Sequence, residues 1–207
     1  MCNYIKPSFK ILTTIDGETV LKSIELAGRV CYKSNDKITD RSAKTFVQNI
    51  IKRKHLSVLE HGGTISVKFI VDIGVARELT RHRLASFAQE STRYVDLKKH
   101  GIELVHPDGL TYSQRERREH HFEEMQALYN EERNEGITPE IARGVLPLSL
   151  KTELVMTANL AEWRHVFSVR ALGTTGKPHP QMLEVMVPLL DAFKLLIPVV
   201  FDDLIIG

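Results

Sequence analysis

Residues 64–94 read TISVKFIVDIGVARELTRHRLASFAQESTRY, and the rest of the chain is arranged around this stretch. Residues 64–71 have the composition of a β-strand, and in residues 73–80 the apolar positions recur at helical spacing. Residues 81–94 are different, because they hold three arginines, a histidine and two serines and gain little from burial. The pattern predicts a buried strand and a short helix, followed by a cationic loop at the end of that helix.

The cationic loop is predicted to bind an anion. Arginine grips phosphate and carboxylate groups through a planar fork of N–H donors, and it stays charged when it is partly removed from water. The alternative is an exposed helix end with ordinary surface arginines, which is the commoner explanation for a short arginine-rich segment. The residues on both sides of the loop are needed to decide between these two interpretations.

The segments around this stretch mix helix and strand without a regular βαβ order. A strand is expected over residues 9–15, and apolar periodicity predicts helices over residues 18–32 and from Thr39 or Asp40 to Lys54. Downstream, the pattern predicts a loop-rich segment at residues 97–109, a charged helix at residues 112–136, a strand at residues 148–157, and helices at residues 159–170 and 180–196. This mixture indicates an α+β fold, a single mixed α/β domain over residues 1–207 with a central sheet flanked by helices.

The composition is ordinary for a soluble globular chain of 207 residues, with 43% hydrophobic and 26% charged residues. A net charge of +2 is too small to favour nucleic-acid binding by the whole surface. Cys2 and Cys31 do not have the spacing of a metal or redox motif, so no disulfide framework is expected. A cytoplasmic location is expected instead. No signal peptide or membrane span is predicted, since the apolar run at residues 195–201 is short and contains Pro198.

A second polar segment, residues 55–63, stands between a predicted helix and a predicted strand. His55, Glu60 and His61 offer ligand atoms for a metal ion, but their spacing matches neither a helical i, i+4 pair nor a zinc motif. The alternative is a loop whose polar groups bond to the backbone. The residues by themselves favour the loop.

Residues 81–83, Arg-His-Arg, followed after seven residues by Ser91, resemble the signature of the flavin-dependent thymidylate synthases. Ser86 and residues 93–94 also match, and the resemblance extends from Val20 to the C-terminal helix. It implies reductive methylation of deoxyuridine monophosphate (dUMP) to thymidine monophosphate (dTMP). It also implies flavin adenine dinucleotide (FAD) as hydride carrier, 5,10-methylenetetrahydrofolate as carbon donor and NADPH as reductant, in a homotetramer whose sites combine residues of more than one subunit.

The resemblance also implies roles for individual residues. The flavin contacts of the family correspond to Ser57, Arg81, His82, Arg83, Gln89, Asn159 and His165. Its nucleotide contacts correspond to Glu78, Arg81, Gln89, Ser91, Arg93, Arg143 and Arg170. His55 falls beside the flavin ring and the folate pocket, and no metal ligand is implied.

Arg170 is the predicted catalytic residue. Carbon 5 of uracil reacts with an electrophilic methylene carrier only when negative charge builds on the ring, and a cation fixed beside N3 and O4 stabilises that charge in a water-poor pocket. The resemblance places Arg170 against this ring. Arg170 is not a general base, because a guanidinium keeps its proton at working pH. Ser91 is assigned to binding, since no Ser-His-acid arrangement can be read around it.

Three places depart from the family pattern. Glu78 stands where members often have glutamine, and a carboxylate there is an alternative partner for an arginine rather than a substrate contact. Ala161 stands where many members carry a flavin-binding arginine; Arg164 is a candidate replacement, although helical geometry places it on another face. Residues 173–180 differ from the family's Ala-x-x-His-Ala-Gln pattern at the rim of the site, and residues 179–182, His-Pro-Gln-Met, are the candidate counterpart of that pattern.

Two other functions are alternatives. A nucleic-acid binding module would use a basic patch with stacking rings, formed by Arg77, Arg81, Arg83, Arg93, Phe87 and Tyr94. A metal hydrolase would use His55, His61 and His82 as ligands for zinc or iron. The near-neutral net charge of the chain weighs against the nucleic-acid binding module. The spacing of the candidate ligands weighs against the metal hydrolase. The flavin enzyme is therefore preferred, with neither nucleic acid nor membrane as an expected partner.

Overall fold

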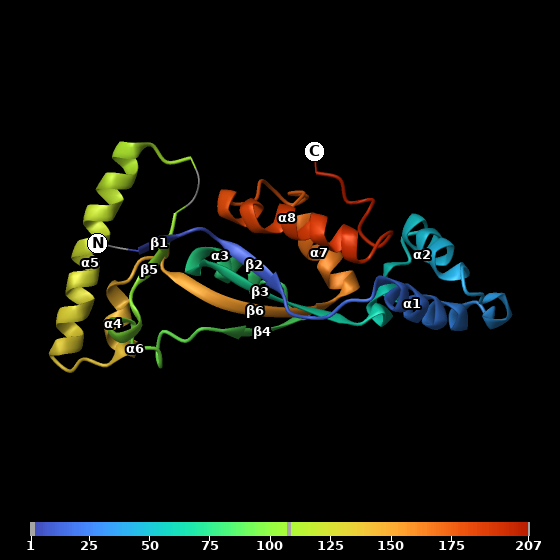
Figure 1. The fold of residues 1–207 in the computed structure, drawn as a ribbon, viewed down its shortest axis with the longest axis horizontal. Helices are drawn as coiled ribbons and strands as arrows, with labels where there is room; N and C mark the ends of the chain where they lie inside the picture. The colour runs from blue at the N-terminus through green and yellow to red at the C-terminus, as the bar shows by residue number, and fades with distance from the viewer. Residues whose placement is uncertain (1–2, 107–108, 207) are drawn as a thin grey trace.

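A computed structural model describes residues 3–106 and 109–206 (Figure 1). Its main sheet has four antiparallel strands in the order β2 (Ser8–Ile11), β3 (Thr64–Asp72), β6 (Lys151–Asn159) and β4 (Ala85–Gln89). A separate parallel pair joins β1 (Asn3–Ile5) to β5 (Glu103–Val105). The fold is therefore mixed α/β, as the sequence predicts.

Strands β3 and β6 pair along their whole length, from Thr64 opposite Asn159 to Asp72 opposite Lys151. Alternate residues of both strands are buried, because a strand directs successive side chains to opposite faces of the sheet. Three helices pack their apolar residues on the buried face: α3 (Ile73–Leu79), α7 (Leu160–Arg170) and α8 (Pro180–Leu196). The helix α3 follows β3 directly, and α7 follows β6 directly, so the two central strands position both helices.

Helices α1 (Gly17–Cys31) and α2 (Ser42–Lys52) lie together at one end of the molecule (Figure 1). The Asp16 carboxylate caps α1 by accepting a 3.1 Å hydrogen bond from the backbone N–H of Glu18. Short 3₁₀ turns at Asn35–Lys37 and Leu56–Gly62 follow α1 and α2 respectively. A Cβ at Gly62 would come within 2.4 Å of Leu160, so the second turn packs closely on the start of α7.

The opposite end of the molecule has its own smaller core. Helix α5 (Tyr112–Asn134) packs there with α4 (Leu97–His100), α6 (Pro139–Ala142) and the 3₁₀ turn Arg143–Val145. The buried apolar residues of this second core are Leu97, Ile102, Leu104, Phe122, Tyr129, Ala142 and Leu150. Gly136 follows α5 with φ +90°, a conformation that glycine adopts without strain, so the helix stops close to its predicted end at residue 136.

Three predicted boundaries differ from the structure. The first strand ends at Ile11 because strand pairing with β3 stops there. The backbone N–H of Ser66 on β3 donates to the side-chain Oγ1 of Thr13 at 2.9 Å, whereas in a continued strand it would donate to a backbone carbonyl. Helix α2 begins at Ser42, so the prediction of a cap at Thr39 or Asp40 is wrong. The Ser42 hydroxyl instead donates to Glu25 on α1. Strand β6 begins at Lys151 because the carbonyls of residues 148 and 150 accept from the first N–H groups of α3.

The cationic stretch itself is not all loop, since residues 85–89 form β4 at the edge of the sheet. Ala85 and Phe87 pack against the core, while Ser86 and Ala88 are exposed. The alternating segment has only five residues, most of them small or polar. The sequence pattern therefore did not distinguish this strand from the cationic loop predicted around it. The segment predicted to be loop-rich at residues 97–109 likewise contains α4 and β5.

Two of the exclusions can be compared with the structure. Within the described residues, none of the helices has the length and apolar character needed to cross a membrane. Cys31 is a free, exposed thiol, and Cys2 lies outside the described residues.

Candidate active site

The signature histidine, His82, is buried beside α7, with 5% of its surface exposed. Its Nδ1 atom lies 3.3 Å from Oε1 of Glu162, in the first turn of α7. Its Nε2 atom accepts a 3.2 Å hydrogen bond from Nε of Arg170, in the last turn of the same helix. His82 therefore connects side chains from the two ends of α7.

Arg170 is held on its other side by Glu78, near the end of α3. Its Nη1 atom lies 2.7 Å from Oε2 of Glu78, and Nη2 donates a 2.8 Å hydrogen bond to the Glu78 backbone carbonyl. That carbonyl is available because the last carbonyls of a helix lack partners within the helix. Glu78 thus pairs with an arginine. This is the role that the sequence offered for a carboxylate at this position as the alternative to a substrate contact. We call Glu78, His82, Glu162 and Arg170 the Arg170 cluster.

Burial and neighbouring cations keep the imidazole of this cluster neutral. Desolvation, followed by the charges of Arg170 and His165, lowers the pKa of His82 from 6.5 to about 4. Burial also raises the pKa of Glu162, against the opposing effect of His165. Arg170 is therefore a fixed cation that contacts a neutral histidine on one side and a carboxylate on the other.

Lowering the pH from 7 to 4 is expected to destabilise the wild-type chain more than a His82→Gln variant. The folded-state pKa of His82, about 4, lies below its ordinary value of 6.5, so the unfolded chain takes up this proton first as the pH falls. The stabilisation is complete above pH 6.5 and is lost between pH 6.5 and 4, by about 3 kcal/mol. Denaturant unfolding of both proteins across this range measures the difference, and parallel pH profiles would contradict it.

The residues assigned to the flavin fit an anionic dinucleotide. Arg81 and Arg83 flank His82 in the chain, both are exposed, and within the described ranges neither guanidinium has an ion-pair partner. Unpaired arginines are the groups that bind a diphosphate. His165 is exposed beside His82, with 5.4 Å between the ring centroids. The Asn159 side-chain oxygen caps α7 by accepting from Glu162 N at 2.8 Å, so its amide N–H groups are what it can offer a ligand.

Two further predicted residues lie next to the start of α7. Ser57 is part of the 3₁₀ turn Leu56–Gly62, which packs against this helix, and His55 directly precedes the turn. Both side chains are exposed. The Nδ1 atom of His55 lies 2.7 Å from the Tyr32 hydroxyl, which fixes its ring against α1. The turn thus presents exposed polar side chains next to α7.

A cleft of about 490 Å³ lies where β4 ends. Three predicted nucleotide contacts line it, Gln89, Ser91 and Arg143. Arg77 and Thr92 line it as well, and Nη1 of Arg143 donates to Oγ1 of Thr92 at 2.9 Å. Apolar side chains complete the lining, including Ile73, Leu146, Leu148 and Leu150. Two arginines and several hydroxyl or amide groups beside an apolar wall suit a phosphorylated ligand with a flat ring.

The hydroxyl of Ser91 has a structural partner but no base. It accepts from the backbone N–H of Arg93 at 3.3 Å, and among the described residues no histidine or carboxylate bonds to it. This arrangement agrees with a binding role. Arg93 itself does not line the cleft, because its Nε atom lies 3.3 Å from Oε2 of Glu140 and its side chain is half exposed.

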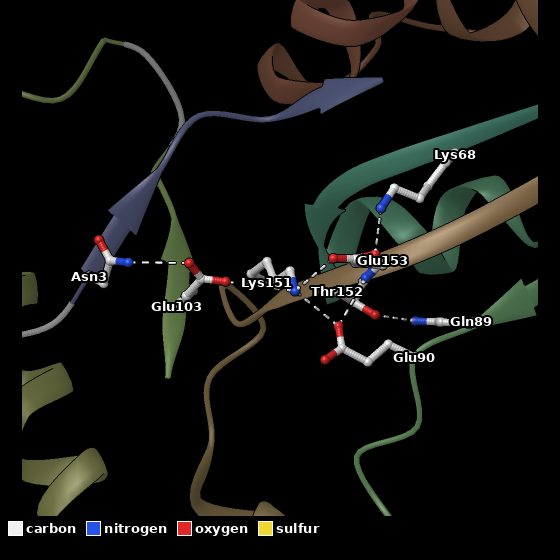
Figure 2. A network of polar contacts seen from close by, with 8 residues as sticks. All are labelled: Asn3, Lys68, Gln89, Glu90, Glu103, Lys151, Thr152 and Glu153. Atoms are coloured by element: carbon white, nitrogen blue, oxygen red, sulfur yellow. Dashed lines mark hydrogen bonds and ion pairs between the residues drawn. The ribbon is translucent and has the colours of Figure 1, made fainter. Parts of the chain in front are cut away.

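A polar network fixes the wall of the cleft (Figure 2). Gln89 donates to Oγ1 of Thr152 at 3.2 Å, and the Glu90 carboxylate accepts from Glu153 N at 3.2 Å. Nζ of Lys151 lies 3.3 Å from Glu90 and 3.2 Å from Glu153. Burial acts to lower the pKa of Lys151, but these carboxylates outweigh it and raise the pKa, so the lysine stays charged. The network holds the end of β4 against β6.

The cleft and the Arg170 cluster are separate groups within one chain. Gln89 pairs with Leu154 and Ala85 pairs with Ala158, so the cleft end of β4 lies about 13 Å along the strand from the end nearer His82. The lining of the cleft includes neither Glu78, Arg81 nor Arg170, all of which are described residues. Helix α3 lies between the groups, with Arg77 in the cleft and Glu78 on Arg170.

Arg164 does not replace the family arginine missing at Ala161. It is buried, and its Nη1 and Nη2 atoms lie 2.6 and 2.7 Å from the Asp203 carboxylate. It also donates to the backbone carbonyl of Val200. Arg164 therefore holds the C-terminal segment against α7, and the idea that it compensates for Ala161 is wrong.

The histidines of the metal-hydrolase alternative do not form one group among the described residues. His55 faces Tyr32, His61 is exposed, and His82 belongs to the Arg170 cluster. A different set, His82, Glu162 and His165, places its ligand atoms within 4.8 Å of one another. The guanidinium of Arg170 donates to the same imidazole, and its positive charge opposes a bound cation there.

Sequence reasoning missed three residues of these groups. Glu162 looks like an ordinary acidic residue in the first turn of a helix, and only the fold shows that it is buried against His82. Arg77 and Thr92 were not assigned to the nucleotide, although Thr92 directly follows Ser91. Arg77 likewise directly precedes Glu78, another predicted nucleotide contact, and these adjacencies were the available signals.

Comparison with known proteins identifies the family of the chain and relatives that share its fold. A model of the family described as thymidylate synthase complementing protein, Thy1, matches residues 13–199. The flavin-dependent thymidylate synthase of Geobacter sulfurreducens is 31% identical over 192 residues, covering 87% of this chain and 80% of that protein. The one from Mycolicibacterium gilvum is 34% identical over 188 residues, covering 80% and 72% respectively. A crystal structure of a UMP/dUMP methylase PolB from Streptomyces cacaoi shares the fold, with a TM-score of 0.82 at 23% identity over 97% of this chain and 95% of that one.

Proposed function

The chain belongs to the thymidylate synthase complementing protein family, and from this premise we propose how its residues carry out the reductive methylation of dUMP to dTMP. As a flavin-dependent thymidylate synthase it depends on FAD, with 5,10-methylenetetrahydrofolate as carbon donor and NADPH as reductant. One observation carries the residue assignment: Arg170 is fixed between Glu78 and His82, and His82 is flanked in the chain by Arg81 and Arg83, two exposed cations without an ion-pair partner among the described residues.

The cleft at the end of β4 binds the nucleotide. Arg143 provides a charged fork for the phosphate, and the hydroxyls of Ser91 and Thr92 and the amide of Gln89 provide neutral hydrogen bonds. Arg93 is released from Glu140 to join them, since that ion pair is half exposed and such pairs contribute little. The apolar lining excludes water from the uracil ring.

The exposed surface around His82 binds the flavin. Arg81 and Arg83 hold the diphosphate, and Ser57, Asn159 and His165 provide hydrogen bonds from the turn before β3 and from α7. When bound, FAD supplies the hydride that completes the methyl group, and NADPH restores it. His55 borders the folate pocket. Arg164 takes no part, because it is committed to Asp203.

Arg170 acts on the uracil ring. Its guanidinium cannot lose a proton, so beside N3 and O4 it stabilises the negative charge that has to build on the ring before carbon 5 attacks the methylene group. Its fixed position means that little reorganisation is needed as this charge develops. Glu78 pairs with the guanidinium in the free chain and turns aside when the ring enters, while His82 and the Glu78 backbone carbonyl keep the guanidinium in place.

The active enzyme is a homo-oligomer, a tetramer by family resemblance, whose sites combine the cleft of one subunit with the Arg170 cluster of another. The separation of these two groups within one chain supports this arrangement. Leu84 and Tyr94 lie in the signature and are 77% and 80% exposed, so contact with another subunit would bury them.

Replacement of Ser91 by alanine is expected to weaken dUMP binding roughly 10-fold and to leave measurable turnover at saturating dUMP. The hydroxyl is a hydrogen-bonding group without a base, so its loss removes affinity rather than a nucleophile. Isothermal titration gives the dissociation constant, and initial rates of dTMP formation give kcat. A complete loss of turnover with unchanged nucleotide affinity would overturn the binding role.

The visible absorption spectrum of the purified protein, before and after addition of dUMP, tests the whole assignment. We expect a flavin band at near-stoichiometric intensity that shifts when dUMP binds, because the uracil and the flavin ring share one pocket. An Arg81→Met, Arg83→Met double variant should lose the band while it keeps its fold. A colourless protein that takes up no added FAD would refute the proposed flavin site.

A further inference from the structure

Glu162 is a buried carboxylate for which the reaction itself supplies no task. Only 6% of its surface is exposed, although it lies in the first turn of α7, where acidic residues usually face water. Its Oε1 atom is 3.3 Å from Nδ1 of His82. Burial of a carboxylate is costly unless its oxygens accept hydrogen bonds, so this contact needs a donor on His82.

The hydrogen bonds of Arg170 determine where His82 carries its proton. A guanidinium has N–H donors and no acceptor, so Nε of Arg170 requires an unprotonated Nε2 on His82. The single proton of the neutral imidazole must then be on Nδ1. The Oε1 atom of Glu162 lies 3.3 Å from that atom and is the group placed to accept from it. Donors and acceptors therefore match along the line Glu162, His82, Arg170, and only one tautomer of His82 allows this.

We propose that Glu162 is a positioning residue, which holds His82 in the Nδ1–H tautomer and, through His82, fixes the guanidinium of Arg170 for catalysis. The inference rests on the proposed role of Arg170. Without an acceptor at position 162, a proton on Nδ1 would be buried without a partner, and only the donor of Arg170 would still favour it there. The other tautomer would set an N–H on Nε2 against the N–H of Arg170, and the guanidinium would lose its contact with His82.

The position of Glu162 on α7 suits this task. The backbone N–H of Glu162 is bonded to the Asn159 side chain, so the first turn is fixed. The positive end of the helix dipole favours a carboxylate at this point. Arg170 stands in the last turn of the same helix, so one rigid element carries both ends of the line. His82 bridges them from the segment after α3.

The test compares Glu162→Met with Glu162→Gln in the purified, flavin-containing protein. Methionine removes the acceptor, whereas glutamine keeps a carbonyl oxygen that can accept from Nδ1–H. We expect Glu162→Met to lower kcat about 10- to 100-fold with little change in KM for dUMP, and Glu162→Gln to restore most of kcat. Ser168→Ala, which removes a hydroxyl bonded to the Arg164 carbonyl on the same helix, serves as the control and should keep wild-type kcat.

Nitrogen-15 NMR of labelled histidines gives a readout independent of turnover, with the His82 signals identified by their loss in His82→Gln. Wild type should show Nδ1–H, and Glu162→Met should show a gain of Nε2–H. Wild-type Nε2–H, or an unchanged tautomer and kcat in Glu162→Met, would overturn the proposal. If Glu162→Met does not fold, the wild-type and Glu162→Gln spectra still decide the tautomer. If the wild-type protein makes no dTMP, the proposed function fails, while the NMR result still judges the role of Glu162.

Discussion

Replacement of Arg170 by methionine is expected to lower kcat for dTMP formation by about 10²- to 10³-fold. Methionine is apolar and similar in length, so it fills the space and removes the positive charge that stabilises the negatively charged uracil ring before carbon 5 attacks. The guanidinium is held by three hydrogen bonds, two to Glu78 and one to His82, so its position is fixed before the ring binds. Product formation is measured at saturating dUMP, folate and NADPH.

Two further variants separate charge from structure in that experiment. Arg170→Lys keeps a cation but not the planar fork, and it should recover only a small part of kcat. Arg53→Met removes an exposed arginine at the end of α2 and should leave kcat unchanged. Flavin absorbance is recorded for every protein, so that loss of cofactor is not mistaken for loss of chemistry. An Arg170→Met protein with full flavin content and wild-type kcat would exclude Arg170 from catalysis.

The long elements of the fold were predictable because their patterns are long. Helices α1, α5, α7 and α8 and strand β3 each carry enough apolar positions, caps or breakers to identify them, and the structure confirms them. Strand β4 was missed because its five residues depend on pairing with β6 rather than on their own preference. The start of α2 was misplaced because Ser42 bonds across to Glu25 on another helix, which no local pattern contains.

The candidate site shows the same limit. The signature and its resemblance indicated Arg81, His82, Ser91 and Arg170 without any structure. The sequence could not show that Arg170 contacts His82 and Glu78, or that Glu162 is buried against His82, because these contacts join α3 to both ends of α7. Nor could it show that Ser91 and Arg170 lie in different groups of one chain. Tertiary pairing, and not local chemistry, decides each of these points.

A mixture of two inactive variants is expected to regain activity if the site is shared between subunits. Arg143→Met damages the cleft and leaves the Arg170 cluster intact, while Arg170→Met does the reverse. Each protein alone should be nearly inactive at low dUMP. In randomly mixed oligomers, a site that takes one group from each of two subunits is intact in about a quarter of cases. The variants are co-expressed with different affinity tags, purified through both tags and assayed for dTMP formation.

The control for this mixture is Arg170→Met co-expressed with itself under both tags, which should stay inactive. Helix α3 separates the two groups within one chain, because Arg77 lines the cleft while the next residue, Glu78, binds Arg170. The experiment tests whether a ligand can reach both groups in the same chain. If a ligand could bridge that helix within one chain, every mixed oligomer would contain only sites with one damaged group, and no activity would return. Recovery near a quarter of wild type therefore requires that the cleft and the Arg170 cluster of a working site come from different chains. The exposed Leu84 and Tyr94 would then lie between those chains, where water has to be excluded from the reacting ring.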